Sequence, residues 1–204
     1  MTTPPAFNGL ARVDRDAATL LPCLITHAQD VKLFDDAHAT DYLWGTHSSS
    51  WVSPWQATEL SVGMLAGCAA QVTAQDVVLD LGCGDGRVLL LLSKEFSCEA
   101  IGWDCSEACI QMAEKLRNTS GIQKCKFQIV DFTKNPVKEE LFRATILFAY
   151  LPVQALNQIR PLLEEAFEHN PDIKLVTNEY HFQDEENWEL LANPSTIRVT
   201  RLKR

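Results

Sequence analysis

The 204-residue chain lacks the cysteine patterns that hold metal ions or build a disulfide framework. Its seven cysteines are an odd number and include no C-x-x-C pair. Cys105 and Cys109 would lie one turn apart on a helix, but two ligands do not complete a tetrahedral zinc site. We therefore expect no bound metal, and we expect reduced, mostly buried thiols of the kind that intracellular proteins carry.

An excess of basic residues and long apolar runs are missing as well. Eighteen lysines and arginines stand against 27 aspartates and glutamates, which gives a formal net charge of -9. This balance does not favour a broad nucleic-acid surface, and no apolar stretch is long enough to span a bilayer. The first residues lack the charged start and apolar run of a signal peptide. We therefore expect a cytoplasmic or nuclear protein whose partner is neither nucleic acid nor membrane.

The length of the chain suits one compact domain with a full core. Residues 1–50 begin with prolines and a glycine and continue with scattered apolar positions, which predicts a tail and a helical cap. Residues 51–204 would form the main unit. A tryptophan-dense segment at 42–55, which ends in Trp55, could either fold over a ligand or pin itself to the core.

Most of the chemical information lies in one stretch, VVLDLGCGDGR at residues 77–87. Its first five residues form a short run that is apolar except for Asp80, which suits a strand buried on both faces of a parallel sheet. Three glycines at alternate positions follow, and good helix formers come after them, so a strand, a tight turn and a helix are predicted in that order. Such a turn lets a ligand lie against bare backbone, while the start of the helix offers free N–H groups.

The glycine spacing and the nearby carboxylates indicate which ligand this turn would bind. A dinucleotide loop reads G-x-G-x-x-G and holds a pyrophosphate at the helix start. Here the spacing is G-x-G-x-G, and Asp80 and Asp85 would repel a pyrophosphate but attract an ammonium and a sulfonium group. These features predict S-adenosylmethionine as the cofactor. The residues predicted to contact it in this stretch are Asp80, Gly82, Cys83, Gly84, Asp85 and Gly86.

Two later strands are also predicted to end in a carboxylate. Residues 100–104 form the first of them, and Asp104 stands at roughly the distance along the chain at which an acidic residue meets a ribose. Its alternative role is to cap the next helix, which Ser106 could do equally well. Residues 126–132 form the other strand and contain Asp131. Ligands of open parallel sheets bind at this carboxyl edge, so both aspartates are candidate ligands.

The segment DLGCGDGR resembles the first motif of the class I, seven-strand S-adenosylmethionine-dependent methyltransferases, D/E-x-G-x-G-x-G. The resemblance implies an α/β fold with a Rossmann-like, doubly wound sheet of seven strands, mostly parallel with an antiparallel C-terminal strand. It further implies that Asp131 accepts from the adenine amino group while Phe132 packs near the ring; a solvated loop position is the alternative for Asp131. Cys105 and Trp55 complete the set of predicted cofactor residues.

The fourth predicted strand, residues 144–150, would face the transferred methyl group in this family. It runs into FAYLP and lacks the [D/N]-P-P-[Y/F] tetrad of enzymes that methylate amino groups of bases or glutamine. Together with the tryptophan-dense segment, Tyr180 and Trp188, the layout is similar to the protein-lysine methyltransferases that modify the ATP synthase c subunit. This likeness implies a lysine acceptor. Tyr150 would then wall an apolar channel that keeps the amine neutral; an ordinary core aromatic is the alternative.

Two other functions share the same predicted cofactor half. A small-molecule O- or N-methyltransferase would differ only in its acceptor side, and a catalytically silent subunit would bind the cofactor to support a partner enzyme. Methyl transfer from a sulfonium needs chiefly proximity and orientation, so no general base has to be found. We therefore expect an enzyme that binds S-adenosylmethionine and methylates a protein lysine.

Overall fold

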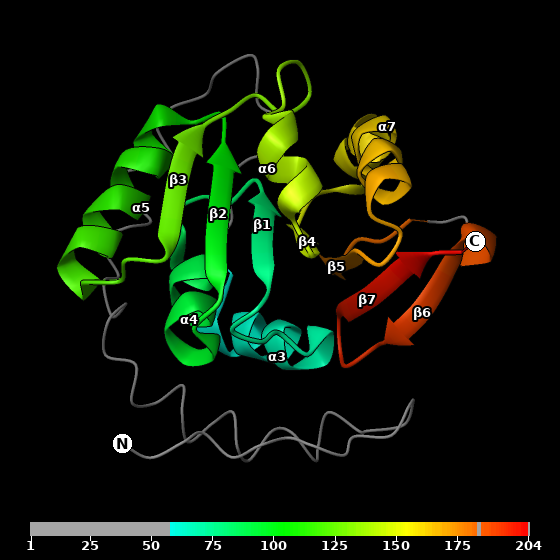
Figure 1. Ribbon diagram of the computed structural model, residues 1–204, viewed down its shortest axis with the longest axis horizontal. Coiled ribbons are helices and arrows are strands. Elements are labelled where there is room, and N and C mark those ends of the chain that lie inside the picture. The colour runs from blue at the N-terminus through cyan, green and yellow to red at the C-terminus, as the bar shows by residue number, and fades with distance from the viewer. Residues whose placement is uncertain (1–57, 183–184, 204) are drawn as a thin grey trace.

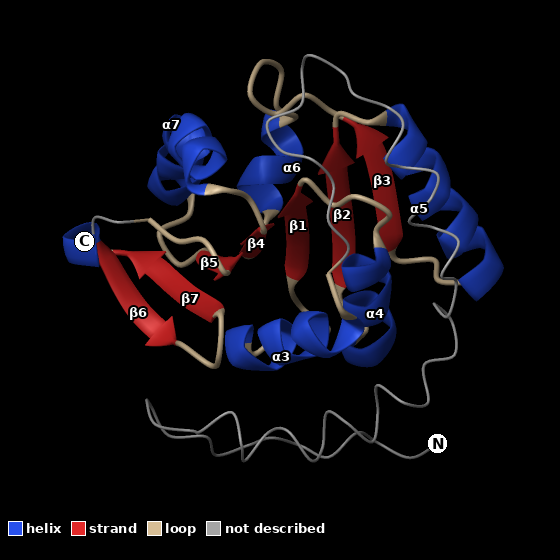
Figure 2. Ribbon diagram, turned by 180° about the vertical axis from the view of Figure 1, so that it is seen from behind, coloured by secondary structure: helices blue, strands red, loops and turns tan. Residues whose placement is uncertain are grey.

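The computed structural model describes residues 58–182 and 185–203 (Figure 1). The predicted helical cap at 1–50 and the tryptophan-dense segment with Trp55 lie outside the described residues. Within the described ranges the chain forms a seven-stranded sheet with helices on both of its faces (Figures 1 and 2). None of the helices in these ranges is long and apolar enough to cross a membrane.

The sheet has the strand order β3-β2-β1-β4-β5-β7-β6. Strands β1 to β5 pair in parallel, whereas β7 runs antiparallel to both of its neighbours, β5 and β6. This arrangement confirms the predicted Rossmann-like sheet with an antiparallel strand near the C-terminus. The strands are β1 (Val77–Leu81), β2 (Glu99–Asp104), β3 (Cys125–Ile129), β4 (Ile146–Ala149), β5 (Lys174–Asn178), β6 (Trp188–Ala192) and β7 (Ile197–Leu202).

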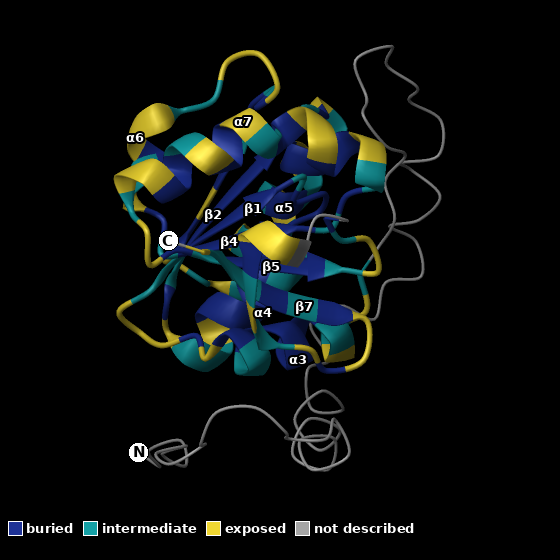
Figure 3. Cartoon of the chain, turned by 90° about the vertical axis from the view of Figure 1, so that its right-hand side faces the viewer, coloured by how far each residue is buried: buried dark blue, intermediate teal, exposed yellow. Residues whose placement is uncertain are grey.

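Two groups of helices cover the two faces of the sheet. One face packs against α3 (Leu60–Ala70), α4 (Arg87–Phe96) and α5 (Glu107–Ser120). The other packs against α6 (Lys138–Arg143) and α7 (Val153–His169). Consecutive residues of β1 enter opposite cores because side chains alternate along a strand: Val78 packs on the first side and Leu79 on the second. The central strands are therefore buried on both faces, as Figure 3 shows.

Helix α6 was not predicted from the sequence, and its formation depends on a tertiary contact. Glu140 on this helix is 6% exposed and accepts a hydrogen bond of 2.8 Å from Nε1 of Trp103, which lies in β2. Lys126 of β3 forms an ion pair with the same carboxylate. A helix of six residues has little stability alone, so its contacts to two strands, of which the bond to Trp103 is buried, hold it in place.

Two strands are shorter than predicted. The predicted strand at 126–132 ends at Ile129, so Asp131 lies in the turn that follows β3 rather than in the strand. The predicted strand at 144–150 is reduced to β4, and Tyr150 lies just beyond its end. Both differences place the candidate side chains in the loops at the carboxyl edge of the sheet, where parallel-sheet ligands bind.

Candidate cofactor and acceptor sites

The glycine loop between β1 and α4 makes the predicted tight turn. Gly84 and Gly86 have φ values of 55° and 73°, in the left-handed region that favours glycine. Gly86 precedes the first residue of α4, and a Cβ atom at Gly86 would lie 2.5 Å from the ring of Phe127. The loop therefore packs against β3 through a position that only glycine can occupy without displacing the neighbouring ring.

The end of β2 fixes the position of this loop. The carboxylate of Asp104 accepts hydrogen bonds from the backbone N–H of Gly84 at 2.9 Å and from that of Ser106 at 2.8 Å. The Trp103 carbonyl accepts from the N–H groups of Gly82 and Cys83 at 2.8 and 3.0 Å. Ser106, and not Asp104, is the N-cap of α5, because its hydroxyl accepts from the Cys109 N–H. Asp104 is thus held against the glycine loop.

The three carboxylates around the glycine loop, Asp80, Asp85 and Asp104, differ in their basic partners among the described residues. Asp85 is 2% exposed, and Nε of Arg87 donates to its two oxygens at 3.0 and 2.8 Å. No such ion pair involves Asp80 or Asp104 within the part of the chain that the structure describes. Burial and the charge of Asp104 raise the pKa of Asp80 to about 7. A cation that binds between Asp80 and Asp104 would relieve this repulsion.

The thiols near the loop are in their neutral form. Burial raises the pKa of Cys83 far above its ordinary value, and the nearby carboxylates raise it further. Burial also raises the pKa of Cys105, which lies next to Asp104. Among the described side chains, no group of three or more His, Cys, Asp or Glu could hold a metal ion. Contact between these two cysteines and a cofactor depends on packing and hydrogen bonding, since neither carries the charge of a thiolate.

Asp131 and Phe132 lie at the predicted end of the cofactor site, beyond β3. The Asp131 carboxylate accepts from Nζ of Lys134 at 2.6 Å and from the Thr133 hydroxyl at 2.5 Å, and these hydrogen bonds lower its pKa. Phe132 is buried at 8% exposure and packs in the same core cluster as Trp103. Their roles at the adenine ring stay predictions. Asp131 would have to accept a further hydrogen bond alongside its present donors.

The ends of β4 and β5 form a second group of side chains beside the loop. Tyr150 follows β4, which pairs with β1 on one side and β5 on the other. Leu151 approaches Gly82: its Cδ2 atom lies 3.3 Å from where a Cβ of Gly82 would be. Burial raises the pKa of Tyr150, and the carboxylate of Glu179, as a hydrogen-bond acceptor and a negative charge, raises it further.

Glu179 was not among the residues predicted from the sequence. It directly follows β5, so it repeats the pattern of a buried strand with an acidic residue at its carboxyl end. Asp80, Asp104 and Asp131 were selected by that same signal. Applied to the fifth strand, it would have identified Glu179 as well.

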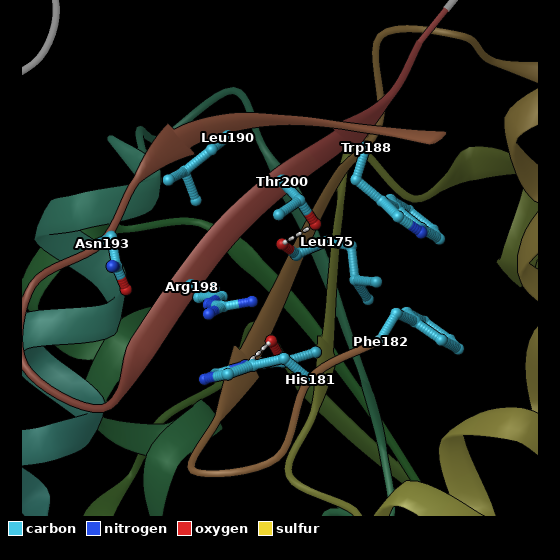
Figure 4. Close-up of a pocket in the computed structure, with 9 residues that line it drawn as sticks. Leu175, His181, Phe182, Trp188, Leu190, Asn193, Arg198 and Thr200 are labelled. Atoms are coloured by element: carbon cyan, nitrogen blue, oxygen red, sulfur yellow. Dashed lines mark hydrogen bonds between the residues drawn. The ribbon is translucent and has the colours of Figure 1, made fainter. Parts of the chain in front are cut away.

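A pocket of about 330 Å³ lies toward the lateral edge of the sheet that ends in β6, among β5, β6 and β7 (Figure 4). Phe182 stacks on Trp188 at its wall with ring centroids 5.0 Å apart, and His181 Nδ1 lies 2.6 Å from the Thr177 hydroxyl. None of the predicted cofactor residues lines it. The lining residues are Leu175, Thr177, His181, Phe182, Trp188, Leu190, Asn193, Arg198 and Thr200.

Comparison with known proteins connects this geometry to methyl transfer. A family model described as a methyltransferase domain matches residues 78–170, from β1 to just beyond α7. A protein-lysine N-methyltransferase from Saccharolobus islandicus (strain REY15A) is 29% identical over 121 residues, which is 56% of this chain and 68% of that protein.

Solved structures share the fold. An RNA methyltransferase from Salinibacter ruber, in complex with S-adenosyl-L-homocysteine, has a TM-score of 0.62 at 22% identity and covers 72% of this chain and 92% of that chain. A tRNA (m1A58) methyltransferase from Aquifex aeolicus has a TM-score of 0.57 at 15% identity and covers 78% of this chain and 74% of that chain. At these identities the likeness extends to the fold and not to the substrate.

Proposed function

We propose that this chain, a class I S-adenosylmethionine-dependent methyltransferase, transfers the methyl group to lysine side chains of a protein. The observation that carries the proposal is the 29% identity to a protein-lysine N-methyltransferase over 121 residues. The absence of a [D/N]-P-P-[Y/F] tetrad after β4 also supports an aliphatic amine over a planar amide or base amine. The chain's net charge of -9 favours a basic protein segment over the polyanionic backbone of RNA.

The residues at the carboxyl edge fit the cofactor. The carboxylates of Asp80 and Asp104 would attract its ammonium and sulfonium groups, and the backbone of the loop around Gly84 offers a surface without side chains. When bound, S-adenosylmethionine supplies a methyl group on a positively charged sulfur. Asp104 is already oriented by two backbone N–H groups, so little reordering is needed when a ribose hydroxyl donates to it.

The acceptor side would bring the amine to the methyl group in its neutral form. Tyr150 lies at the end of β4 and is half-buried, so it offers an aromatic wall beside the glycine loop. Desolvation against such a wall lowers the pKa of an amine, which frees the lone pair for attack. The remaining work is alignment of donor and acceptor, for which rigid strand ends are well suited.

The test is the destination of a labelled methyl group. The full chain is incubated with S-[methyl-³H]adenosylmethionine and a cell extract, and label is then measured in protein, RNA and small molecules. We expect label in protein bands that resist ribonuclease and release methyllysine on acid hydrolysis. Label that enters only RNA or only small molecules would overturn the lysine assignment while leaving the methyltransferase assignment in place.

A further inference from the structure

We infer that Glu179 is the acceptor-side carboxylate of this enzyme, which holds the attacking amine by an N–H bond and balances the positive charge formed on its nitrogen. This inference rests on the proposed lysine methylation and names the residue that would distinguish an amine acceptor from a neutral hydroxyl. It concerns a residue outside the cofactor loop.

The strand register brings Glu179 to the reaction edge. Strand β4 lies between β1 and β5, with Phe148 opposite Asp80 and Ala149 opposite Thr177. Glu179 therefore follows β5 at the same edge where Tyr150 follows β4 and the glycine loop follows β1. Leu151, the residue after Tyr150, packs at Gly82 and so joins the end of β4 to the glycine loop.

The environment of Glu179 is suited to an amine. Its carboxylate faces the hydroxyl of Tyr150, and the pKa of that hydroxyl is raised by burial and by Glu179. Tyr180, the next residue, is 44% exposed, so a second aromatic ring is available to an incoming side chain. A carboxylate between two tyrosines can accept N–H bonds while the rings contact the methylene groups of a lysine.

Glu179 differs from other surface glutamates in its charged neighbours among the residues that the structure describes. Other glutamates on the surface have basic partners, such as Glu99 with Arg143 and Glu189 with Arg201. Over residues 58–182 and 185–203, no lysine or arginine is recorded in an ion pair with Glu179. Glu179 is also exposed, so among the described residues its negative charge can reach a cationic or partly cationic group of a substrate.

The backbone at Glu179 is held in a conformation that glutamate seldom adopts. Its φ is 59°, in the left-handed region, and it is the centre of a tight turn in which the Tyr180 N–H donates to the Asn178 carbonyl at 2.6 Å. The Glu179 N–H donates to the Thr196 carbonyl at 2.9 Å, which fixes the turn to the loop before β7. Glycine would adopt this turn at lower free energy, and backbone strain of this kind is concentrated at functional sites.

The chemistry of methyl transfer to an amine provides a role for the Glu179 carboxylate. A lysine first loses a proton to water, and a remaining N–H of the neutral amine then donates to Glu179 and orients the lone pair. That lone pair forms the new C–N bond while the C–S bond breaks and the sulfur keeps its electron pair. The positive charge passes from sulfur to nitrogen, and a fixed carboxylate stabilises it as it develops. The proton that the methylated ammonium later loses goes to solvent.

Three variants test the inference: Glu179→Gln, which removes the charge, Glu179→Gly, which removes the side chain and relieves the turn, and Glu168→Gln as a matched control. Glu168 is an exposed residue near the end of α7, at the opposite edge of the sheet. Each variant and the wild type receive labelled S-adenosylmethionine and the RNA-depleted protein fraction of a cell extract. Methyllysine formation, cofactor affinity by calorimetry and melting temperature are measured on each preparation.

We expect both Glu179 variants to form methyllysine at least tenfold more slowly than wild type, with cofactor affinity within twofold of wild type and no fall in the melting temperature of Glu179→Gly. The control keeps wild-type activity. If Glu179→Gln or the relaxed Glu179→Gly forms methyllysine as fast as wild type, the carboxylate has no such role and the inference is wrong. If the wild type forms no methyllysine at all, the proposed function fails first, which is seen before any variant is compared.

Discussion

The cofactor side and the acceptor side of this sheet differ in how far their side chains are buried. On the cofactor side Trp103 is fully buried, Asp85 is 2% exposed, and the glycine loop is fixed by hydrogen bonds to the end of β2. On the acceptor side Tyr180 is 44% exposed, and Glu179 is exposed as well. The methyl donor is common to a whole fold, whereas acceptors differ between enzymes, so the residues that select the acceptor are expected among the more exposed side chains.

The largest loss of cofactor affinity is expected when a side chain is added to the glycine loop. Gly84→Val places a β-branched side chain at a φ of 55° and at the backbone surface that the cofactor is predicted to touch. We expect affinity for S-adenosylmethionine to fall by more than about 100-fold, or roughly 2.7 kcal/mol. Isothermal titration calorimetry measures this change directly.

A matched control separates strain from crowding. Gly121 has a φ of 70° at the end of α5, and a Cβ there would have no heavy atom within 4 Å. Gly121→Val should therefore show the cost of the left-handed backbone alone, as a lower melting temperature with normal cofactor affinity. Equal affinity losses in the two variants would mean that the loop around Gly84 is not the binding surface.

A smaller effect is expected when the carboxylate that joins loop and cofactor is neutralised. Asp104→Asn keeps the size of the side chain but removes a charged acceptor, whose hydrogen bonds contribute about 1.5–3 kcal/mol each. Cofactor affinity should fall roughly 10- to 100-fold. Asp131→Asn should cost less than about tenfold, because the adenine amino group is a neutral donor. A larger loss at Asp131 than at Asp104 would reverse the assignment of the two positions.

The pH dependence of binding follows from Asp80. Its pKa is raised to about 7 in the ligand-free protein, first by burial and then by Asp104. A sulfonium or ammonium ligand favours the ionised form, so affinity should rise about tenfold from pH 6 to pH 8, with proton release on binding. Titrations in buffers of different ionisation enthalpy measure that release, and Asp80→Asn should abolish the slope.

The raised pKa of Asp80 makes the stability of the ligand-free protein fall with rising pH, whereas it makes cofactor affinity rise. The folded-state pKa lies above the unfolded value, so the buried carboxylate costs nothing below about pH 4 and its cost grows as the pH rises toward 7. The ligand-free protein should therefore lose stability from pH 5 to pH 7.5, while Asp80→Asn should lose less. A wild-type melting temperature that rises over this interval in step with the variant would show that Asp80 titrates normally.

The smallest change in cofactor affinity is expected on the acceptor side. Tyr150→Ala should lower turnover about tenfold or more while cofactor affinity stays within twofold, because alignment at the reacting centre is lost. An ordinary core role would instead lower stability by about 3–5 kcal/mol and leave turnover per folded molecule unchanged. Melting temperature, donor affinity and methyl transfer on one preparation distinguish these outcomes.

The same contrast explains which features could be predicted from the sequence. The strand and loop from Val77 to Arg87 are local: apolar run, glycine spacing and helix formers agree, so the segment was identified with its boundaries. Helix α6 was missed because it depends on the contact of Glu140 with Trp103, 37 residues away in the sequence. Glu179 has the local signal of an acidic residue after a buried strand, but its place beside the end of β4 depends on the strand order of the sheet.

The position of the bound cofactor is tested most directly by hydrogen exchange on the wild-type chain. With saturating S-adenosylmethionine, amide exchange should slow in peptides that cover residues 80–86 and 102–106, where the N–H groups of Gly84 and Ser106 surround Asp104. Peptides from residues 188–200, which line the pocket of Figure 4, should exchange at the ligand-free rate. Protection confined to 188–200, with residues 80–86 unchanged, would show that the cofactor does not bind at the glycine loop.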